Sequence, residues 1–375
     1  MYFNMRIFNF MLSLLVLVSF AGSCNGQHEF INDLSPAPFI KTVSTEYAGK
    51  AAYDIPVVIE GANFNPDPAK NSIVLGVGMH AVEYPASEAS ENRIVFNAPY
   101  SEDQKVLMKL ISDGAESNPV YLEYDRVKTD SLFLLNDAAI RKLRPGVTWA
   151  NIYKEWAGAI RSINLVTIEL NERNRINIAC PTKSTRTSEQ CLKYGAFLGV
   201  NGSYFSSTYV RVDGQMIRPG KDQGVDVFMR DGVFTIDDNV PGMAYVGSNE
   251  RASRLPNRNI MTCGPLLILN DKHREMAAGN HNETTHPRTG VGITKDGRII
   301  LVTVDGRFVD KAVGMPTTLF ARLMDAFGAE HALNLDGGGS TTMWIEGLGI
   351  VNHPCDDRNW DNPVERKIGS ILYLK

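Results

Sequence analysis

The sequence predicts a small all-β sandwich followed by a larger α+β domain, built as a mixed sheet with few helices. Short apolar segments follow one another between residues 55 and 111 and are separated by Gly, Asn, Asp and Pro, a spacing typical of antiparallel sandwiches. Beyond residue 195 the apolar runs again have the length of strands and outnumber the helical patterns. The 375 residues, 43% of them hydrophobic, are enough for two domains with separate cores.

Residues 1–24 have the features of an export signal. Arg6 gives a basic start, residues 7–20 are mainly apolar, and residues 21–23 are small, in a stretch too short for a membrane span. Cys24 follows directly, as does the acceptor cysteine of a bacterial lipobox, so we expect an exported lipoprotein tethered to a periplasmic or cell-surface membrane face by lipid alone. Ala21 stands where a lipobox usually has Leu, which leaves plain secretion as the alternative.

The remaining cysteines predict disulfides, because an even number in an oxidising compartment usually pairs. These residues are Cys180, Cys191, Cys263 and Cys355. Three pairings are arithmetically open. We favour Cys180–Cys191, because only ten residues separate them, with Cys263 and Cys355 as a second pair. Zinc is the alternative, but the sequence has no CxxC or HxxxH spacing.

The predicted sandwich spans residues 38–126, after a linker at 25–37 that contains the string DLSPAP. Its strings VIEGANF at 58–64, NSIVLG at 71–76 and GAESNPVYLEY at 114–124 resemble an IPT/TIG domain, which has an immunoglobulin-like fold. The resemblance implies a spacer without catalytic residues.

The larger domain is predicted at residues 127–375. Residues 149–160 have apolar spacing that predicts a helix, and residues 163–170 predict a strand. Thr317 to Phe327 predicts a second helix, with Thr317 as its cap and an apolar face. Further strands are predicted at 196–200, 266–269, 299–304, 332–335 and 370–374.

A glycine-rich turn follows one of these strands, in the string NLDGGGST at 334–341. Asp336 stands at the strand end, and the next three residues are Gly337, Gly338 and Gly339. Successive backbone N–H groups in such a turn form an anion-binding nest. The alternative is a tight turn with no ligand. No Lys follows the glycines, so the string is not a P-loop.

A predicted hairpin brings charged residues together. The strings HPRTGVGIT, from His286, and LVTVDGR, ending at Arg307, are joined by an Asp-Gly turn. Arg288 would then lie near Asp305 and Arg307, where two guanidinium groups can clamp a phosphate. The alternative is a surface ion pair between Asp305 and an arginine.

The string GVNGSYF at 199–205 is a third candidate. Asn201 could hydrogen-bond a sugar, and the ring of Tyr204 or Phe205 could stack on its apolar face. The alternative is an aromatic residue buried at a turn.

These strings, together with RPGVTW at 144–149, TCGPLLILN at 262–270 and RKIGSILYL at 366–374, occur in the order seen in the phosphodiester glycosidase family, which this sequence resembles over residues 130–375. The resemblance implies hydrolysis of the sugar C1–O–phosphate link of a glycosyl phosphodiester or other phosphorylated glycan. The family's usual small or aromatic residue after the Asn-Gly pair is here Ser203, and the disulfide-rich appendages of the animal members are missing, so their capped-mannose substrate is not carried over.

The residue types suit this chemistry. A phosphate ester is a weakly basic leaving group, so its charge must be held, and preorganised donors such as Arg288, Arg307 and the glycine amides supply about 3 to 4 kcal/mol each to a transition state. Thr289 and Ser340 are further expected substrate contacts. The sugar needs a carboxylate as nucleophile or base, for which Asp305 and Asp336 are candidates with unassigned roles.

Other functions remain open. No motif requires a cofactor, although a divalent cation could bridge Asp336 and phosphate. A non-catalytic glycan-binding lipoprotein and a metal-dependent phosphodiesterase that cleaves P–O are the alternatives. His286 is a weak acid–base candidate because Pro287 makes its turn rigid. The net charge of −4 is small and dispersed, which argues against nucleic acid as a partner; no pattern indicates an oligomeric state.

Overall fold

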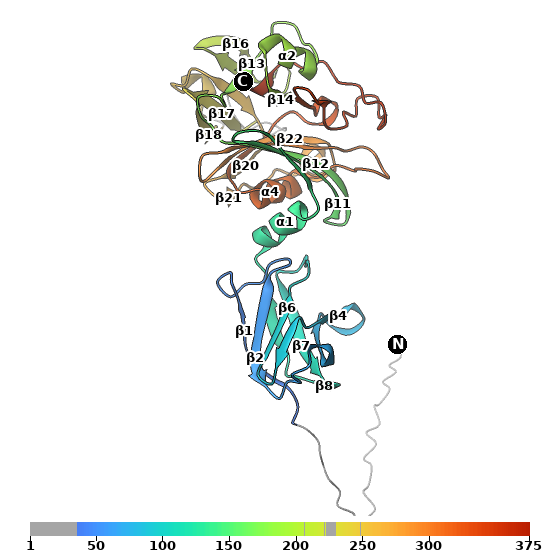
Figure 1. Ribbon diagram of the computed structural model, residues 1–375. Coiled ribbons are helices and arrows are strands. Elements are labelled where there is room, and N and C mark those ends of the chain that lie inside the picture. The colour runs from blue at the N-terminus through green and yellow to red at the C-terminus, as the bar shows by residue number, and fades with distance from the viewer. Residues whose placement is uncertain (1–35, 206, 221, 223–229, 248) are drawn as a thin grey trace, which may run out of the picture. The chain divides into compact units, whose positions relative to one another are not determined.

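The computed structural model describes residues 36–205, 207–220, 222, 230–247 and 249–375 (Figure 1). The predicted export signal and the lipid attachment at Cys24 lie outside the described residues and stay predictions. In the described part of the chain, no helix is long and apolar enough to cross a membrane.

Strands dominate the structure, which corrects the predicted fold class. The described residues form 27 strands and four α-helices, and the strands are arranged in five antiparallel sheets. The prediction of an α+β domain behind a separate sandwich is therefore wrong, and the chain is mostly β. The antiparallel sheets need only short turns between neighbouring strands, so few connecting helices are required.

One source of this error is the segment 149–160, predicted as a helix. It belongs to a long hairpin of β11 (Val147–Trp156) and β12 (Ala159–Ile168). Ala157 and Gly158 turn the chain with φ of +49° and +70°, in the left-handed region that two-residue hairpin loops use. Large apolar residues spaced four apart, such as Ile152 and Trp156, fit the buried face of a strand as well as a helix face.

The first two sheets face each other over a small core. Ile59, Phe96, Met108 and Leu110 are fully buried between them. One sheet contains β1 (Phe39–Thr45), β2 (Pro56–Ala62), β6 (Arg93–Asn97) and β5 (Glu88–Ser90). The other contains β4 (Val82–Pro85), β3 (Asn71–Leu75), β7 (Lys105–Ser112), β8 (Ala115–Glu116) and β9 (Val120–Glu123). The likeness to IPT/TIG domains and the boundaries at 38 and 126 stay predictions.

An eight-stranded sheet forms the centre of the C-terminal region. Besides β11 and β12, it contains β10 (Ala139–Arg144), β23 (Ile299–Val304), β22 (Arg288–Thr294), β24 (Ala329–Asn334), β20 (Leu266–Leu269) and β21 (Lys272–His273). The predicted helix is present as α4 (Thr317–Ala326), which packs Phe320, Leu323 and Met324 against one face of this sheet (Figure 1). Its N-cap is Pro316, so Thr317 is the first helical residue rather than the cap.

The opposite face packs on two five-stranded sheets. Val200, Met261, Leu301 and Leu333 belong to this shared, fully buried core. One sheet contains β13 (Ile176–Ala179), β27 (Ile371–Leu374), β14 (Leu198–Asn201), β25 (Met343–Ile345) and β26 (Gly349–Ile350). The other contains β16 (Gln215–Pro219), β15 (Tyr209–Val212), β19 (Ile260–Cys263), β17 (Gly232–Asp237) and β18 (Val240–Tyr245).

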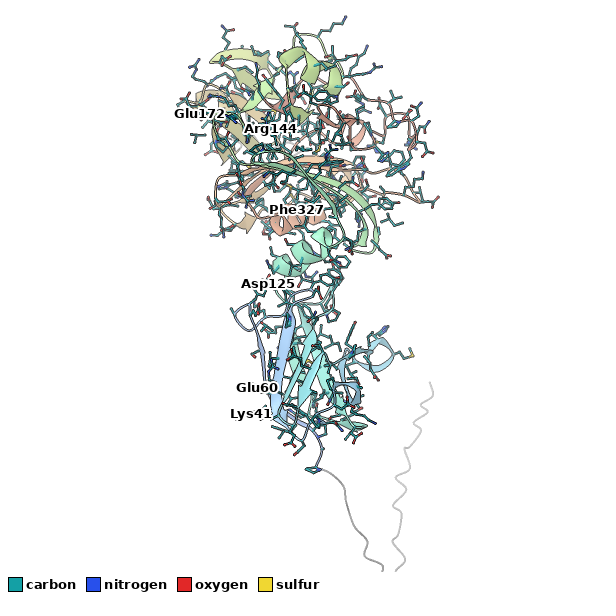
Figure 2. The ribbon with its side chains drawn as sticks, viewed as in Figure 1. Lys41, Glu60, Asp125, Arg144, Glu172 and Phe327 are labelled. Carbon is teal, nitrogen blue, oxygen red and sulfur yellow. The ribbon has the colours of Figure 1, made fainter. Side chains whose placement is uncertain are left out.

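Asp125 and Arg144, both labelled in Figure 2, fix the start of one helix and the end of the chain. Asp125 caps α1 (Arg126–Leu135) by accepting a hydrogen bond from the amide of Lys128. Arg144 lies over the ring of Phe197, 4.2 Å from its centroid, and donates to the carbonyl of Lys375. The last strand is thereby held beside the start of the eight-stranded sheet.

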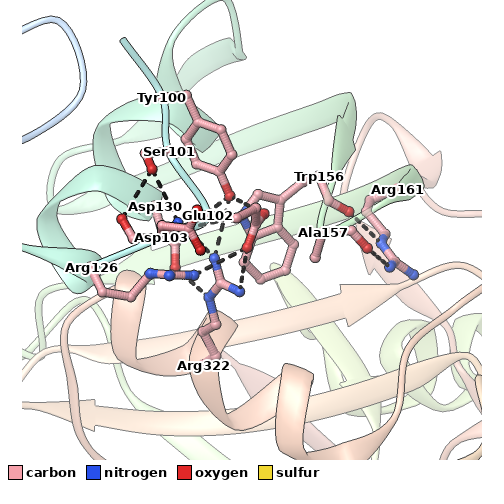
Figure 3. A network of polar contacts seen from close by, with 10 residues as sticks. All are labelled: Tyr100, Ser101, Glu102, Asp103, Arg126, Asp130, Trp156, Ala157, Arg161 and Arg322. Carbon is pink, nitrogen blue, oxygen red and sulfur yellow. Dashed lines mark hydrogen bonds and ion pairs between the residues drawn. The ribbon is translucent and has the colours of Figure 1, made fainter. Parts of the chain in front are cut away.

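A buried ion pair joins α1 to α4 (Figure 3). Asp130 is fully buried, and its two carboxylate oxygens accept from Nε and Nη2 of Arg322 at 2.6 and 2.7 Å. The indole N–H of Trp156 adds a third bond at 3.1 Å, and Glu102, from the connection after β6, accepts from Arg322 Nη1 at 3.1 Å. The network therefore connects α4 to α1, to the end of β11 and to the connection after β6.

The predicted disulfides are wrong, because the structure has four free, buried thiols at these positions, Cys180, Cys191, Cys263 and Cys355. Burial raises the pKa of all four, and that of Cys191 to about 12. Cys191 lies on α2 (Thr187–Tyr194) and packs against Gly199, where an added Cβ would come within 2.6 Å of its sulfur. Such thiols act as small apolar side chains of the core.

Candidate active site

A cavity of about 370 Å³ lies where the predicted strings meet. Its lining comes from the loops after β14, β23 and β24, from the segment before β22, and from segments near residues 230 and 366. The lining residues are Tyr204, Phe205, Ser207, Arg230, His281, His286, Arg288, Arg307, Asp336, Gly337, Gly338 and Arg366.

The register of the eight-stranded sheet explains this convergence. Arg288 at the start of β22 pairs with Val304 at the end of β23, and Gly290 pairs with Asn334 at the end of β24. The loops that leave β23 and β24 therefore emerge at the edge where β22 begins. The β22–β23 hairpin, predicted from the Asp-Gly turn, brings the start of β22 beside the end of β23. Gly297 in that turn has φ +78°.

Asp336 is the one carboxylate in the lining made by the described residues. Its Oδ2 is buried and has no hydrogen-bond partner in the protein. Burial raises the pKa of Asp336 to about 6, against the opposing effects of the Ser340 hydroxyl and the Arg366 guanidinium. An unpaired carboxylate oxygen beside an open cavity can act as nucleophile or as base.

Arg288 presents a buried positive charge to the same cavity. Only 1% of the residue is exposed, and burial lowers its pKa to about 10. Its Nε donates to the carbonyl of Met315 at 2.9 Å and its Nη2 to that of His281 at 2.7 Å. Within the described ranges no carboxylate pairs with Arg288, so its charge is available to an anionic ligand.

Arg307 lines the cavity and lies against Gly338. Its own φ is +67°, and its Nη1 lies 3.9 Å from Sγ of Cys355. A Cβ added to Gly338 would lie 3.0 Å from Nη2 of Arg307, so glycine at 338 leaves room for the guanidinium. Like Arg288, Arg307 forms no ion pair with a carboxylate of the described residues.

Two further arginines line the cavity and were missed by the sequence analysis. Arg366 pairs with Asp356, through Nε at 2.9 Å, and Arg230 donates from Nη1 to the carbonyl of Ser207 at 3.1 Å. Arg366 begins the string RKIGSILYL, so the sequence contained a signal for it. Arg230 lies in no motif.

Tyr204 and two histidines complete the wall. The hydroxyl of Tyr204 donates to the carbonyl of Gly264 at 2.7 Å and lies 3.0 Å from Nε2 of His281. Burial lowers the pKa of His281 to about 4, which keeps it neutral at pH 7. His286 reaches the cavity although its turn argued for a purely structural role, and burial together with Arg288 lowers its pKa.

Asp305 does not reach the cavity. The residue is 1% exposed; its Oδ2 accepts from Oγ of Ser162 at 2.6 Å, and its Oδ1 accepts from Asn352 Nδ2 at 3.0 Å and from the amide of His353 at 2.8 Å. Burial raises its pKa. The geometry therefore does not support the predicted pair of catalytic carboxylates, Asp305 and Asp336.

Several predicted substrate contacts lie beneath the cavity instead. Asn201 is fully buried, and it donates to the backbone carbonyl of Asp336 at 2.6 Å and accepts from Thr289 Oγ1 at 2.8 Å. Ser340 is fully buried as well, and Gly339 faces Arg366 and Asp356. These residues shape the turn that holds Asp336.

The predicted anion nest has fewer free backbone amides than the three glycines suggested. The N–H of Gly338 donates to the carbonyl of Pro287 at 2.9 Å, so it is not available to a ligand. Gly337 and Gly338 line the cavity, and residues 338–340 form a short 3-10 helix. As for a metal, the described residues contain no group of three His, Cys, Asp or Glu side chains arranged to hold one.

Comparison with known sequences places these motifs in a family. The model of the family described as phosphodiester glycosidase matches residues 194–375. The N-acetylglucosamine-1-phosphodiester alpha-N-acetylglucosaminidases of mouse and cattle are 32% identical over 89 residues and 30% identical over 88. The SPbeta prophage-derived uncharacterized protein YomE of Bacillus subtilis is 33% identical over 97 residues. These alignments cover 23 to 25% of this chain but only 15 to 16% of the relatives' own length.

A solved structure has the same fold. The catalytic domain of zebrafish N-acetylglucosamine-1-phosphodiester alpha-N-acetylglucosaminidase, auto-inhibited by its pro-peptide, superposes with a TM-score of 0.50 at 19% sequence identity. The match covers 62% of this chain and 85% of that one. The comparisons thus give a match of residues 194–375 to the phosphodiester glycosidase family model and, separately, a likeness of fold to this catalytic domain.

Proposed function

We propose that the protein hydrolyses the bond between sugar C1 and a phosphate oxygen in glycosyl phosphodiesters. One observation carries the proposal: Asp336, whose buried Oδ2 has no hydrogen-bond partner in the protein, lines a cavity whose wall also holds Arg288 and Arg307, two guanidinium groups that form no ion pair with a carboxylate of the described residues. A phosphodiester carries one negative charge. Its charge and that of Asp336 balance the two arginines, which makes such a ligand electrostatically complementary.

Among the described residues the cavity wall holds a single carboxylate, which suits this substrate class better than an ordinary glycoside. Glycosidases usually use two carboxyl groups, one of which protonates the departing oxygen. A phosphate ester leaves as a stable anion and does not need that proton. Arg288 and Arg307 would stabilise the leaving charge, while Asp336 attacks C1 or activates a water molecule.

The remaining wall fits a sugar ring. Tyr204 and Phe205 both line the cavity, and Phe205 is 37% exposed, so an aromatic face is open to the apolar side of a pyranose. The names of the mouse, cattle and zebrafish relatives point to N-acetylglucosamine 1-phosphodiesters. We propose a sugar 1-phosphodiester of the cell envelope or of host glycans as the substrate, in keeping with the predicted export signal.

The test is a screen of sugar 1-phosphodiesters, beginning with N-acetylglucosamine, on the wild type and on Asp336→Asn. The wild type should release sugar, and the variant should lose at least about 1,000-fold in kcat/KM while still binding substrate. Reaction in ¹⁸O-labelled water should place the label in the sugar.

Label in the phosphate would overturn the proposal in favour of P–O cleavage. Substrate binding by the wild type without turnover of any tested ester would instead indicate a glycan-binding protein.

A further inference from the structure

We infer that Asp305 is a positioning residue, which holds Arg307 and Arg366 at the cavity without touching substrate. The inference rests on the proposed function and deepens it. Asp305 is notable because it lies two residues before a cavity arginine, does not itself line the cavity, and has both of its oxygens hydrogen-bonded to other segments.

The hydrogen bonds of Asp305 leave no oxygen for a ligand. Ser162 donates to one oxygen, and the side chain of Asn352 and the amide of His353 donate to the other. The backbone of Asp305 adds a bond, since its N–H donates to the carbonyl of Ser162 at 2.9 Å. A buried carboxylate that accepts hydrogen bonds from two separate segments fixes those segments relative to each other.

These partners belong to segments that deliver the cavity arginines. Asn352 and His353 begin the segment that contains Cys355 and Asp356, and Asp356 pairs with Arg366. Arg307 contacts the same segment, with its Nη1 3.9 Å from Sγ of Cys355. Asp305 therefore ties the loop of Arg307 to the segment that orients Arg366.

The other end of the Arg307 loop is held by the neighbour of Ser162. Arg161 is 4% exposed and donates from Nη1 to the carbonyl of Gly314, and its remaining nitrogens donate to the carbonyls of Trp156 and Ala157 at 3.0 and 2.9 Å (Figure 3). Residues 305 and 314 are thus both anchored to the start of β12. A loop anchored at both ends holds Arg307 in one place.

Two substitutions separate positioning from catalysis at this residue. In Asp305→Asn the side-chain oxygen can still accept from Asn352 and His353, and the amide nitrogen can donate to the Ser162 hydroxyl. The hydrogen bonds that position the Arg307 loop are therefore kept. Asp305→Ala removes every side-chain bond. A carboxylate acting as nucleophile or base would be lost equally in both variants.

The experiment measures kcat and KM of the full chain on a sugar 1-phosphodiester for Asp305→Asn, Asp305→Ala and Asp336→Asn. We expect Asp305→Asn to keep kcat/KM within about 10-fold of the wild type, and Asp305→Ala to lose about 100-fold with a raised KM, the size of effect that a displaced clamp produces. Asp336→Asn should lose at least about 1,000-fold in kcat/KM. Asp305→Asn as inactive as Asp336→Asn would overturn the inference.

Binding of inorganic phosphate, measured by calorimetry, keeps the inference separate from the proposed reaction. Phosphate should bind to Asp305→Ala about 10-fold more weakly than to the wild type and to Asp305→Asn, even if no sugar phosphodiester is hydrolysed. Equal affinity of the wild type and the Ala variant would contradict the inference.

Asp130→Asn is the matched control, a buried carboxylate outside the cavity, and should bind phosphate as the wild type does. If Asp305→Ala does not fold, Ser162→Ala replaces it, with an expected weakening of roughly 3-fold in a variant that still folds, because it loses only one of the hydrogen bonds to Asp305. An unchanged affinity in Ser162→Ala would then count against the inference.

Discussion

Burial of Asp336 affects activity and stability in opposite ways. Its raised pKa, to about 6, means that the folded protein binds a proton here more tightly than the unfolded chain does. The carboxylate must be ionised to attack C1 or water, so activity needs a pH above about 6. Ionisation inside the fold is unfavourable, so the contribution of this residue to stability is greatest at low pH and is lost as the pH rises towards 6.

We therefore predict two effects of pH. In the wild type, kcat/KM should fall about tenfold per pH unit below pH 6, because the ionised fraction of Asp336 falls by that factor. Asp336→Asn should raise the free energy of unfolding at pH 7.5 by about 2 kcal/mol but leave it nearly unchanged at pH 4. Urea denaturation at the two pH values measures the difference, and a variant with equal gains at both would show that the carboxylate is not strained by burial.

At the scale of elements, the turn after β24 carries Asp336 and, two residues later, the glycine that lies against Arg307. Gly338 has φ +60°, a conformation that side chains rarely adopt, and lies against the guanidinium of Arg307. Gly347, in a turn after β25, has φ +75° but no atom within 4 Å of an added Cβ. The two glycines share a left-handed backbone conformation, which would be strained in any other residue, and differ in their contact with the cavity.

Gly338→Ala should therefore cost about 1 to 2 kcal/mol of stability and also lower kcat/KM at least about 10-fold, because the methyl group displaces Arg307. Gly347→Ala, the matched control, should cost similar stability with unchanged kinetics. Thermal melts and steady-state kinetics of both variants provide the comparison. Equal activity in the two would mean that Arg307 is not held by this turn.

The pair of helices α1 and α4 is a second element-scale feature, stabilised by Asp130 and Arg322 rather than by apolar contact alone. Removing one partner of a buried pair leaves an uncompensated charge, which typically costs 3 to 5 kcal/mol. Asp130→Ala should lower the free energy of unfolding by about that amount without changing KM, because the pair lies outside the cavity. Glu88→Ala, which breaks an exposed pair with Arg93, should change stability by less than about 1 kcal/mol in the same denaturation experiment.

For the whole molecule, the sequence was most informative where local chemistry decides the structure. The Asp-Gly turn predicted the β22–β23 hairpin, and the apolar face of residues 317–327 predicted α4. The Asp336 turn and the arginines of two strings were found in the same way. These signals depend on neighbouring residues and so can be read along the chain.

The rest depended on contacts between distant segments. Residues 149–160 form a hairpin because ten-residue strands pair across the sheet, which overrides a weak helical pattern. Asp305 is buried because Ser162 and Asn352, remote in sequence, converge on it. His281 lies on α3 (Asn280–Glu283), a four-residue helix with no apolar periodicity, and so left no signal.

The four buried thiols also bear on how this chain matures. The four thiols are free, so they contribute to the described fold through non-covalent packing. A chain refolded with reductant present has the same set of contacts to recover as one refolded without it. Oxidation of the Cys355 thiol would instead destabilise the fold, because oxygen atoms added to its sulfur would clash with the guanidinium of Arg307.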